Sequence, residues 1–269
     1  MNYKEIIENA HNTGDLKEFE QIFEQFLSSL EDGSIRSANP TENGWETCAW
    51  VKRGILLGFK FGTIIEYKRS ETKSFLDKST FPERNFTLAD QIRVVPGGTS
   101  IRRGAHLGKS IIIMPPSYVN VGAYVDDGSL IDSHALVGTC AQIGKNVHLS
   151  AAAQIGGVIE PIGANPVIIE DNVFIGGNCG VYEGVIIQKN AILAAGVILT
   201  AGTPVYDAVN KSFLPKTIGK PVIIPENAVI VSGTRPLKDN SGFSVYCPII
   251  IKYRDQKSDN SVELEALIR

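Results

Sequence analysis

Residues 131–155 read IDSHALVGTCAQIGKNVHLSAAAQI, and within this stretch an aliphatic side chain returns at every sixth position. The same spacing extends in both directions, with a slip of two residues after Ile155, where 169 − 155 gives 14 instead of 12. A hexad repeat of this length is typical of a solenoid, in which stacked coils bury a continuous core. The aliphatic positions are Ile101, Leu107, Ile113, Val119, Val125, Ile131, Val137, Ile143, Leu149 and Ile155, then Ile169, Ile175, Val181, Ile187, Leu193, Leu199 and Val205.

A second set of positions gives the shape of each coil. A small or β-branched residue, as at Ala105, Ala123 and Ala141, stands four positions after most of the aliphatic residues and should also point inward. Gly or Asn often precedes it and tolerates the positive φ that a sharp corner requires. Three hexads, or 18 residues, then close one triangular coil, and residues 18 apart should stack at about the 4.8 Å strand spacing. These corner residues are Gly104, Gly122, Gly128, Asn146, Asn172, Asn190 and Gly196.

The pattern therefore predicts a mainly β protein built on a parallel β-helix, with other structure at both ends. We divide the chain into an N-terminal, mostly α-helical domain over residues 1–90, the β-helix over residues 91–235, and a C-terminal β element with a tail over residues 236–269. Because the open ends of a solenoid need to be covered, the flanking segments are expected to act as caps.

Local patterns predict the elements of these flanking parts. Apolar residues at helical spacing predict helices over 16–30 and 48–61, with a turn at Asn43-Gly44 between them, while residues 70–90 read as a loop. After the repeat, residues 222–232 read as one more coil and residues 244–253 as a terminal strand.

Composition excludes several classes of partner. The 26 basic and 29 acidic side chains give a net charge of −3, which provides no positive field for nucleic acid or anionic lipid. No apolar run approaches the roughly 20 residues that span a bilayer, and the N-terminus has no signal-peptide core, so we expect a cytoplasmic protein. The four cysteines lack C-x-x-C spacing, which favours buried thiols over disulfides or a zinc site.

Several stretches of the repeat region are more specific than the bare hexad pattern. They include RVVP at 93–96, IRRGA at 101–105, YVNVGAYVD at 118–126, CAQIGKNVHLS at 140–150, IIEDN at 168–172 and EGV at 183–185. These stretches resemble the tetrahydrodipicolinate N-succinyltransferase family, and the likeness covers nearly the whole chain. The resemblance implies a left-handed β-helix in a homotrimer whose active sites lie between subunits. It also implies transfer of succinyl from succinyl-CoA to the amino group of tetrahydrodipicolinate, in its ring-opened form L-2-amino-6-oxopimelate, in the diaminopimelate route to lysine.

The resemblance points to two catalytic carboxylates. An amine attacks a thioester only when uncharged, so the reaction needs a base. Asp132 follows the inward Ile131 near a corner and matches the family's acidic residue, with a role in catalysis and in binding the acceptor, although a single Asp on a solenoid is usually only solvated. Glu183 is the second candidate, because the chain has Gly180 where the family leads us to expect a glutamate.

The remaining site residues would bind the two substrates. A dicarboxylate acceptor calls for guanidinium groups, and we assign Arg93 and Arg102 to it. The CoA arm should lie extended along the coils. The predicted contacts of CoA are the backbone near Gly157 and Ala195, with Arg235 or Lys238 near the phosphates. No resident metal is expected.

Three alternatives remain open at this level. An acetyl-CoA-dependent N-acetyltransferase would use the same fold, often with a histidine base such as His106, His134 or His148. A zinc enzyme with histidines on adjacent coils is disfavoured, because 148 − 106 gives 42, which is not a multiple of 18. A solenoid that only presents an interaction surface would not be stabilised by CoA.

Overall fold

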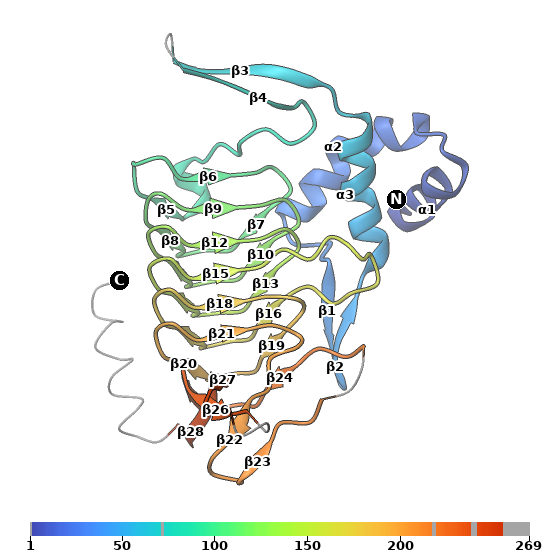
Figure 1. Ribbon diagram of the computed structural model, residues 1–269. Helices are drawn as coiled ribbons and strands as arrows, with labels where there is room; N and C mark the ends of the chain where they lie inside the picture. The colour runs from blue at the N-terminus through green and yellow to red at the C-terminus, as the bar shows by residue number, and fades with distance from the viewer. Residues whose placement is uncertain (1, 71–72, 217–218, 238–240, 255–269) are drawn as a thin grey trace.

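The computed structural model describes residues 2–70, 73–216, 219–237 and 241–254. Most of these residues form a tall stack of short strands, and helices pack beside its upper coils (Figure 1). The helices are α1 (Tyr3–Thr13), α2 (Lys17–Glu31) and α3 (Ala49–Phe61), with one turn of 3-10 helix, η1, at Leu88–Asp90.

The stack has three faces, and each face is a sheet that we name by its first strand. The β5 sheet runs through β5 (Arg93–Val94), β8 (Ile112–Ile113), β11 (Leu130–Ile131), β14 (His148–Leu149), β17 (Phe174–Ile175), β20 (Ile192–Leu193), β25 (Ala228–Val231), β28 (Ile249–Tyr253), β22 (Tyr206–Asp207) and β23 (Ser212–Phe213). The β6 sheet runs through β6 (Ser100–Ile101), β9 (Tyr118–Val119), β12 (Leu136–Val137), β15 (Gln154–Ile155), β18 (Gly180–Val181) and β21 (Ile198–Leu199). The β7 sheet runs through β7 (His106–Leu107), β10 (Tyr124–Val125), β13 (Gln142–Ile143), β16 (Ile168–Ile169), β19 (Ile186–Ile187) and β24 (Ile223–Ile224).

The register of the stack confirms the predicted coil length. Val119 pairs in parallel with Val137, and Val137 with Ile155, so stacked partners are 18 residues apart. All three side chains have no exposed surface. Ala105 and Ala141, from the small-residue set, are buried in the same core. Each coil buries the apolar side chains of its neighbours, so the stacked coils share one continuous hydrophobic core although a single coil is too small to have its own.

The corners adopt the predicted conformation. All seven Gly and Asn corner residues named above have positive φ, as in Gly122 at 73° and Asn146 at 53°. Other residue types adopt it as well, among them His134 at 63° and Glu183 at 55°, which the sequence pattern did not predict. The stacking of the coils evidently holds these side chains in a backbone region that they rarely occupy alone.

A loop interrupts the repeat where the sequence slips. Ile143 pairs with Ile169, 26 residues later, so eight residues more than one coil are inserted between β15 and β16. This loop reaches across to the N-terminal helices, where the buried Lys52 donates a hydrogen bond from Nζ to the carbonyl of Ala164. Burial lowers the pKa of that amine.

A second interruption follows β21. Val205 is buried, but the chain there leaves the coil and forms the hairpin β22–β23 before it returns as β24. Strands β24 and β25 then stack on β19 and β20, which confirms the extra coil predicted over 222–232.

The predicted terminal strand is divided in two. Residues 244–253 form β27 (Ser244–Tyr246) and β28, with Cys247 and Pro248 between them. Pro248 has no N–H for a ladder, which explains the break. Strand β27 pairs with β26 (Thr234–Pro236), and β28 pairs antiparallel with β25 and parallel with β22 in the β5 sheet. The antiparallel strand covers the last coil.

The N-terminal helices agree with the sequence, but one segment does not. Helices α2 and α3 lie where apolar spacing predicted them, and the Asn43-Gly44 turn joins β1 (Ala38–Thr41) to β2 (Gly44–Thr47). The loop predicted over 70–90 is wrong in part, because β4 (Lys73–Lys78) pairs with β3 (Ile64–Ser70). Strand β4 reads KSFLDK, and its polar ends leave too few apolar residues for a recognisable strand pattern. It becomes a strand because it pairs with β3.

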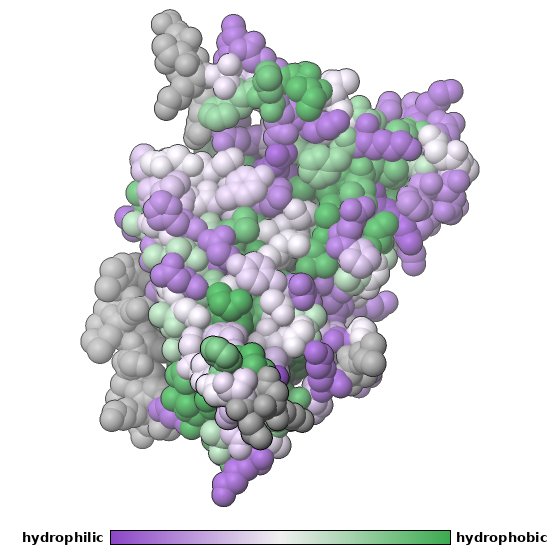
Figure 2. Space-filling model, in the orientation of Figure 1, coloured by the Kyte–Doolittle hydropathy of each residue, from purple (hydrophilic) through white to green (hydrophobic). Residues whose placement is uncertain are grey.

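The hairpin β3–β4 forms an arm that extends above the first coils (Figure 1). Its apolar side chains are unusually exposed, with Leu76 at 74% and Ile64 at 60%. Figure 2 shows this apolar surface in green at the top of the molecule.

Among the described residues, no helix combines the length and the apolarity that a membrane crossing demands.

Strand β21 offers a matched test of the inward and outward assignment. Leu199 is fully buried and Ile198 is 37% exposed in the same strand. Leu199→Ala should lower the free energy of unfolding by about 2–5 kcal/mol through cavity formation, whereas Ile198→Ala should cost about 1 kcal/mol or less. Denaturant unfolding at one fixed protein concentration measures both. Equal losses would contradict the inward orientation of Leu199.

Candidate active site

The predicted site residues lie on two different edges of the triangular stack. The Asp132 edge joins the β5 sheet to the β6 sheet and consists of the corner residues after β8, β11, β14, β17 and β20. The Glu183 edge joins the β6 sheet to the β7 sheet and consists of the corner residues after β6, β9, β12, β15 and β18. One full side of the triangle separates them.

Asp132 is half-buried at its corner, and the coil fixes its backbone. Its N–H donates to the carbonyl of Leu149 on the next coil at 2.9 Å, and its carbonyl accepts from Ser117 Oγ at 2.8 Å. One carboxylate oxygen, Oδ1, accepts from the N–H of Ser133 at 2.7 Å. No bond to the other oxygen, Oδ2, is formed within the described residues, so it is available to a substrate amine.

Small residues line the Asp132 edge below the carboxylate. Ser150, Gly176 and Ala194 occupy the equivalent corner position on the next three coils. Ala195, the residue after Ala194, is exposed. The coils are so close here that a Cβ at Gly176 would come within 2.5 Å of the backbone nitrogen of Ala195. The edge thus presents close-packed backbone over about 14 Å, at the 4.8 Å strand spacing. An extended ligand could lie along it, as predicted for Ala195.

Glu183 and Gly157 lie on the other edge. Glu183 is exposed, and its Oε2 accepts from the N–H of Ala201 on the next coil at 3.1 Å. Gly157 is exposed at the start of the inserted loop, where a Cβ at Gly138 would come within 2.1 Å of its nitrogen. A side of six residues at about 3.3 Å each places the Glu183 edge roughly 15–20 Å from Asp132. One subunit therefore cannot bring Asp132 and Glu183 to the same atom.

The structure gives a physical reason for the glycine at position 180. Gly180 faces outward in β18, and the ring of Tyr182 lies over it. A Cβ at Gly180 would come within 2.4 Å of Tyr182 Cε2 and 2.8 Å of its hydroxyl oxygen. A glutamate at this position is incompatible with the present place of the ring. The sequence analysis did not single out Tyr182. The only signal for it was a glycine, Gly180, two positions before this aromatic residue, where the family leads us to expect a glutamate.

The two predicted substrate arginines differ in their surroundings. Arg93 is exposed in the first strand of the β5 sheet, two strands from Leu130 in the same outward column. Arg102 is half-buried, and its guanidinium donates to Tyr118 Oη at 2.6 Å and to Asp77 Oδ2 at 2.6 Å. A carboxylate ligand would have to displace Asp77.

Arg102 also lines a hollow of about 620 Å³ between the β3–β4 arm and the first coils. The Asp77 pair and a further bond from Nη1 to the carbonyl of Phe81 at 3.1 Å attach the base of the arm to the solenoid. The hollow contains aromatic side chains from both parts, including Tyr67 and Tyr118.

The predicted phosphate contacts lie at the C-terminal end. Arg235 is half-buried in β26, whose partner is β27. Lys238 lies outside the described residues.

Comparison with known proteins places the chain in a family. Residues 2–61 match the model described as tetrahydrodipicolinate N-succinyltransferase N-terminal, and residues 166–201 match the hexapeptide repeat of succinyl-transferase. A 2,3,4,5-tetrahydropyridine-2,6-dicarboxylate N-succinyltransferase from Herminiimonas arsenicoxydans is 43% identical over 91% of this chain and 88% of its own length. The enzyme of the same name from Burkholderia mallei is 40% identical over 99% of this chain and 98% of its own. This chain belongs to the tetrahydrodipicolinate N-succinyltransferase family.

Membership in this hexapeptide-repeat family confirms the fold that the resemblance implied, a left-handed parallel β-helix with helices at its N-terminus. A solved hexapeptide-repeat acetyltransferase from Vibrio cholerae is 20% identical over 47% of this chain and 68% of its own, with a TM-score of 0.34, a similarity too weak to indicate function.

The histidines of this succinyltransferase-family chain occupy separate places. His106 stacks on Tyr124 at 4.2 Å and donates from Nδ1 to the carbonyl of Glu31 at 2.9 Å, and burial lowers its pKa. His148 lies against Phe174 on the β5 sheet, and His134 is exposed on the Asp132 edge. Within the described part of the chain, no three His, Cys, Asp or Glu side chains are grouped to hold a metal ion.

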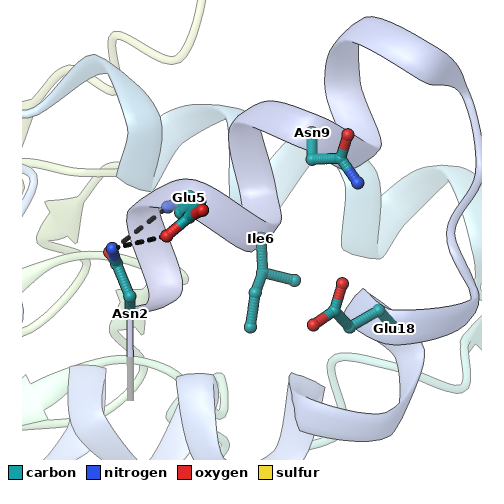
Figure 3. A pocket seen from close by; sticks show the side chains of 5 residues that line it. All are labelled: Asn2, Glu5, Ile6, Asn9 and Glu18. Atoms are coloured by element: carbon teal, nitrogen blue, oxygen red, sulfur yellow. Dashed lines mark hydrogen bonds between the residues drawn. The ribbon is translucent and has the colours of Figure 1, made fainter.

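A further hollow, of about 340 Å³, lies on the N-terminal helices and not on either edge (Figure 3). Its walls are Asn2, Glu5, Ile6, Asn9 and Glu18. Asn2 caps α1 by accepting from the N–H of Glu5 at 3.4 Å, and it donates to the Glu5 carboxylate at 2.9 Å. These bonds serve the start of the helix.

Proposed function

We propose that this chain transfers succinyl from succinyl-CoA to the amino group of tetrahydrodipicolinate, reacting as ring-opened L-2-amino-6-oxopimelate, in the diaminopimelate route to lysine. The observation that carries the proposal is its similarity, at 43% and 40% identity over nearly its whole length, to enzymes named for this reaction. The family's N-terminal domain is present as well as its hexapeptide repeat.

The chemistry assigns a role to Asp132. The nitrogen of the acceptor attacks the thioester carbon, the C–S bond breaks, and the CoA sulfur leaves as a thiolate that then takes a proton. Asp132 accepts the proton that the amine loses, because the carboxylate of this half-buried corner residue has one oxygen, Oδ2, with no hydrogen bond from the described residues. Arg93, which is exposed in the same sheet, binds one carboxylate of the acceptor.

The CoA arm in this proposal follows the small-residue surface. Its pantetheine part lies along the backbone at Ala195 on the Asp132 edge of one subunit and meets Gly157 on the Glu183 edge of the next, with Arg235 or Lys238 near the phosphates. An extended chain fits an edge where backbone atoms are exposed, as at these two positions.

The active enzyme is proposed to be a homotrimer with sites between subunits. The Asp132 and Glu183 edges of one chain are roughly 15–20 Å apart, so a complete site takes the Asp132 edge from one subunit and the Glu183 edge from the next. A cyclic arrangement of three chains provides three such pairs of edges.

We further propose that the reaction takes place in the cytoplasm. All four cysteines are free thiols, as is usual in a reducing compartment.

Donor preference tests the function directly. Purified protein should release free CoA in the presence of tetrahydrodipicolinate, and succinyl-CoA should give a higher kcat/KM than acetyl-CoA. A thiol reagent follows the release, and omission of the acceptor is the control. A clear preference for acetyl-CoA would favour an N-acetyltransferase, the alternative left open by Gly180.

Asp132→Asn should lower kcat by about 10²–10⁴-fold, because an amide cannot accept the proton of the amine. The matched control is Asp126→Asn. Asp126 stands one hexad earlier and accepts from the N–H of Asp127 at 2.8 Å, as Asp132 does from Ser133 at 2.7 Å. Normal turnover in Asp132→Asn would remove this residue from the mechanism.

Mixed trimers test the shared site. Asp132→Asn and Glu183→Gln should each be nearly inactive alone. Coexpressed in equal amounts, they should recover about a quarter of wild-type activity, because one site in four combines two intact edges if subunits assemble at random. No recovery would contradict a site shared between subunits, and a fully active Glu183→Gln enzyme would remove Glu183 from it.

A further inference from the structure

Tyr182 occupies an unusual place on the Glu183 edge. Its ring lies over two glycines on adjacent coils, since a Cβ at Gly156 would come within 2.7 Å of its Cδ1 and a Cβ at Gly180 within 2.4 Å of its Cε2. The N–H of Gly156 donates to the carbonyl of Val181 at 2.8 Å, so the two coils are held in this register. Any side chain at either glycine would displace the ring.

The hydroxyl of Tyr182 has a different environment from its ring. Among the described residues no hydrogen bond to this hydroxyl is found, and the side chain is half-buried. By contrast, the hydroxyl of Tyr118, on the same sheet, accepts from Arg102 at 2.6 Å. A phenol whose ring is packed and whose oxygen is unpaired presents a hydrogen-bond donor at a fixed position.

Tyr182 lies next to the predicted CoA contact on the Glu183 edge, with its ring against Gly156 and its hydroxyl over Gly180. Gly157 follows Gly156, on which the ring lies, and Glu183 follows Tyr182 itself. The carboxylate of Glu183 only accepts hydrogen bonds when ionised and already accepts from the N–H of Ala201. It cannot stabilise negative charge on a second oxygen, whereas a phenol can.

From this geometry we propose that Tyr182 is a catalytic residue of the acyl transfer, and that its hydroxyl donates a hydrogen bond to the thioester carbonyl oxygen. This inference rests on the proposed function. As the amine nitrogen attacks, the carbonyl oxygen gains negative charge, and the hydroxyl stabilises it without giving up its proton. When the C–S bond breaks, the carbonyl reforms and the amine proton has passed to Asp132 of the neighbouring subunit.

Tyr182→Phe is the direct test, because it removes the oxygen and keeps the ring on its two glycines. The expected result is a loss of about 10²-fold in kcat for succinyl-CoA, as for other single oxyanion donors, with the melting temperature and the KM for succinyl-CoA unchanged. Tyr206→Phe is the matched control. Tyr206 packs on Phe213 in the hairpin beyond the last coil, and its variant should keep wild-type kcat.

A second variant tests the position of the hydroxyl with Tyr182 intact. Gly180→Ala places a Cβ against the ring and should lower kcat by displacing it, whereas Gly163→Ala, with no atom within 4 Å of its Cβ, should have no effect. Wild-type kcat in both Tyr182→Phe and Gly180→Ala would overturn the role of Tyr182 while the proposed function stands. A wild-type protein without acyl transfer from any acyl-CoA would overturn the proposed function, and this inference with it.

Discussion

The coil-to-coil hydrogen bonds of the β-helix are the constraint on which the rest of the structure depends. Backbone N–H groups of each coil donate to carbonyl oxygens of the next coil at fixed positions. For example, the N–H of Tyr118 donates to the carbonyl of Ala135 at 3.1 Å, and the N–H of Leu136 donates to the carbonyl of Ala153 at 3.0 Å. With one partner every 18 residues, as for Val119 and Val137, the chain has no freedom to move a side chain from one face to another. A shift of one residue would turn the aliphatic column outward.

This rigidity determines what the edges present. Corner residues stack as strictly as core residues, so Asp132 has small neighbours below it and Glu183 has Ala201. The stack also holds Glu183 at a φ of 55°, in a region where non-glycine residues are strained. Chemistry on such a scaffold comes from single side chains at fixed corners, and the distance between two edges is a property of the fold. A site that uses both edges requires a second subunit.

The contacts of the N-terminal helices with the β-helix include the Glu183 edge. The helices pack against the upper corners of this edge, where a Cβ at Gly104 would meet Leu27 at 2.9 Å and one at Gly122 would meet Ile55 at 2.7 Å. Lys52 also binds the inserted loop that begins near Gly157. Helix α3 is therefore linked through Lys52 to the loop that follows Gly157 in the same subunit.

The sequence alone determined the solenoid, its coil length and the helices α2 and α3, because each of these follows from a periodicity that local stereochemistry imposes. Through family resemblance it also pointed to Asp132, near a corner, and to Glu183 as candidate carboxylates. Only the tertiary structure decided which edge each residue occupies, since the slip after Ile155 marks a break in the repeat without showing which sheet the chain rejoins, and the hairpin β22–β23 has no sequence signal of its own. It likewise decided that Arg102 is paired with Asp77 and that Tyr182 covers Gly180. Arg102 and Asp77 belong to different segments, and the ring of Tyr182 also lies against Gly156 on the adjacent coil, so both contacts depend on how backbone segments pack, which no periodicity contains.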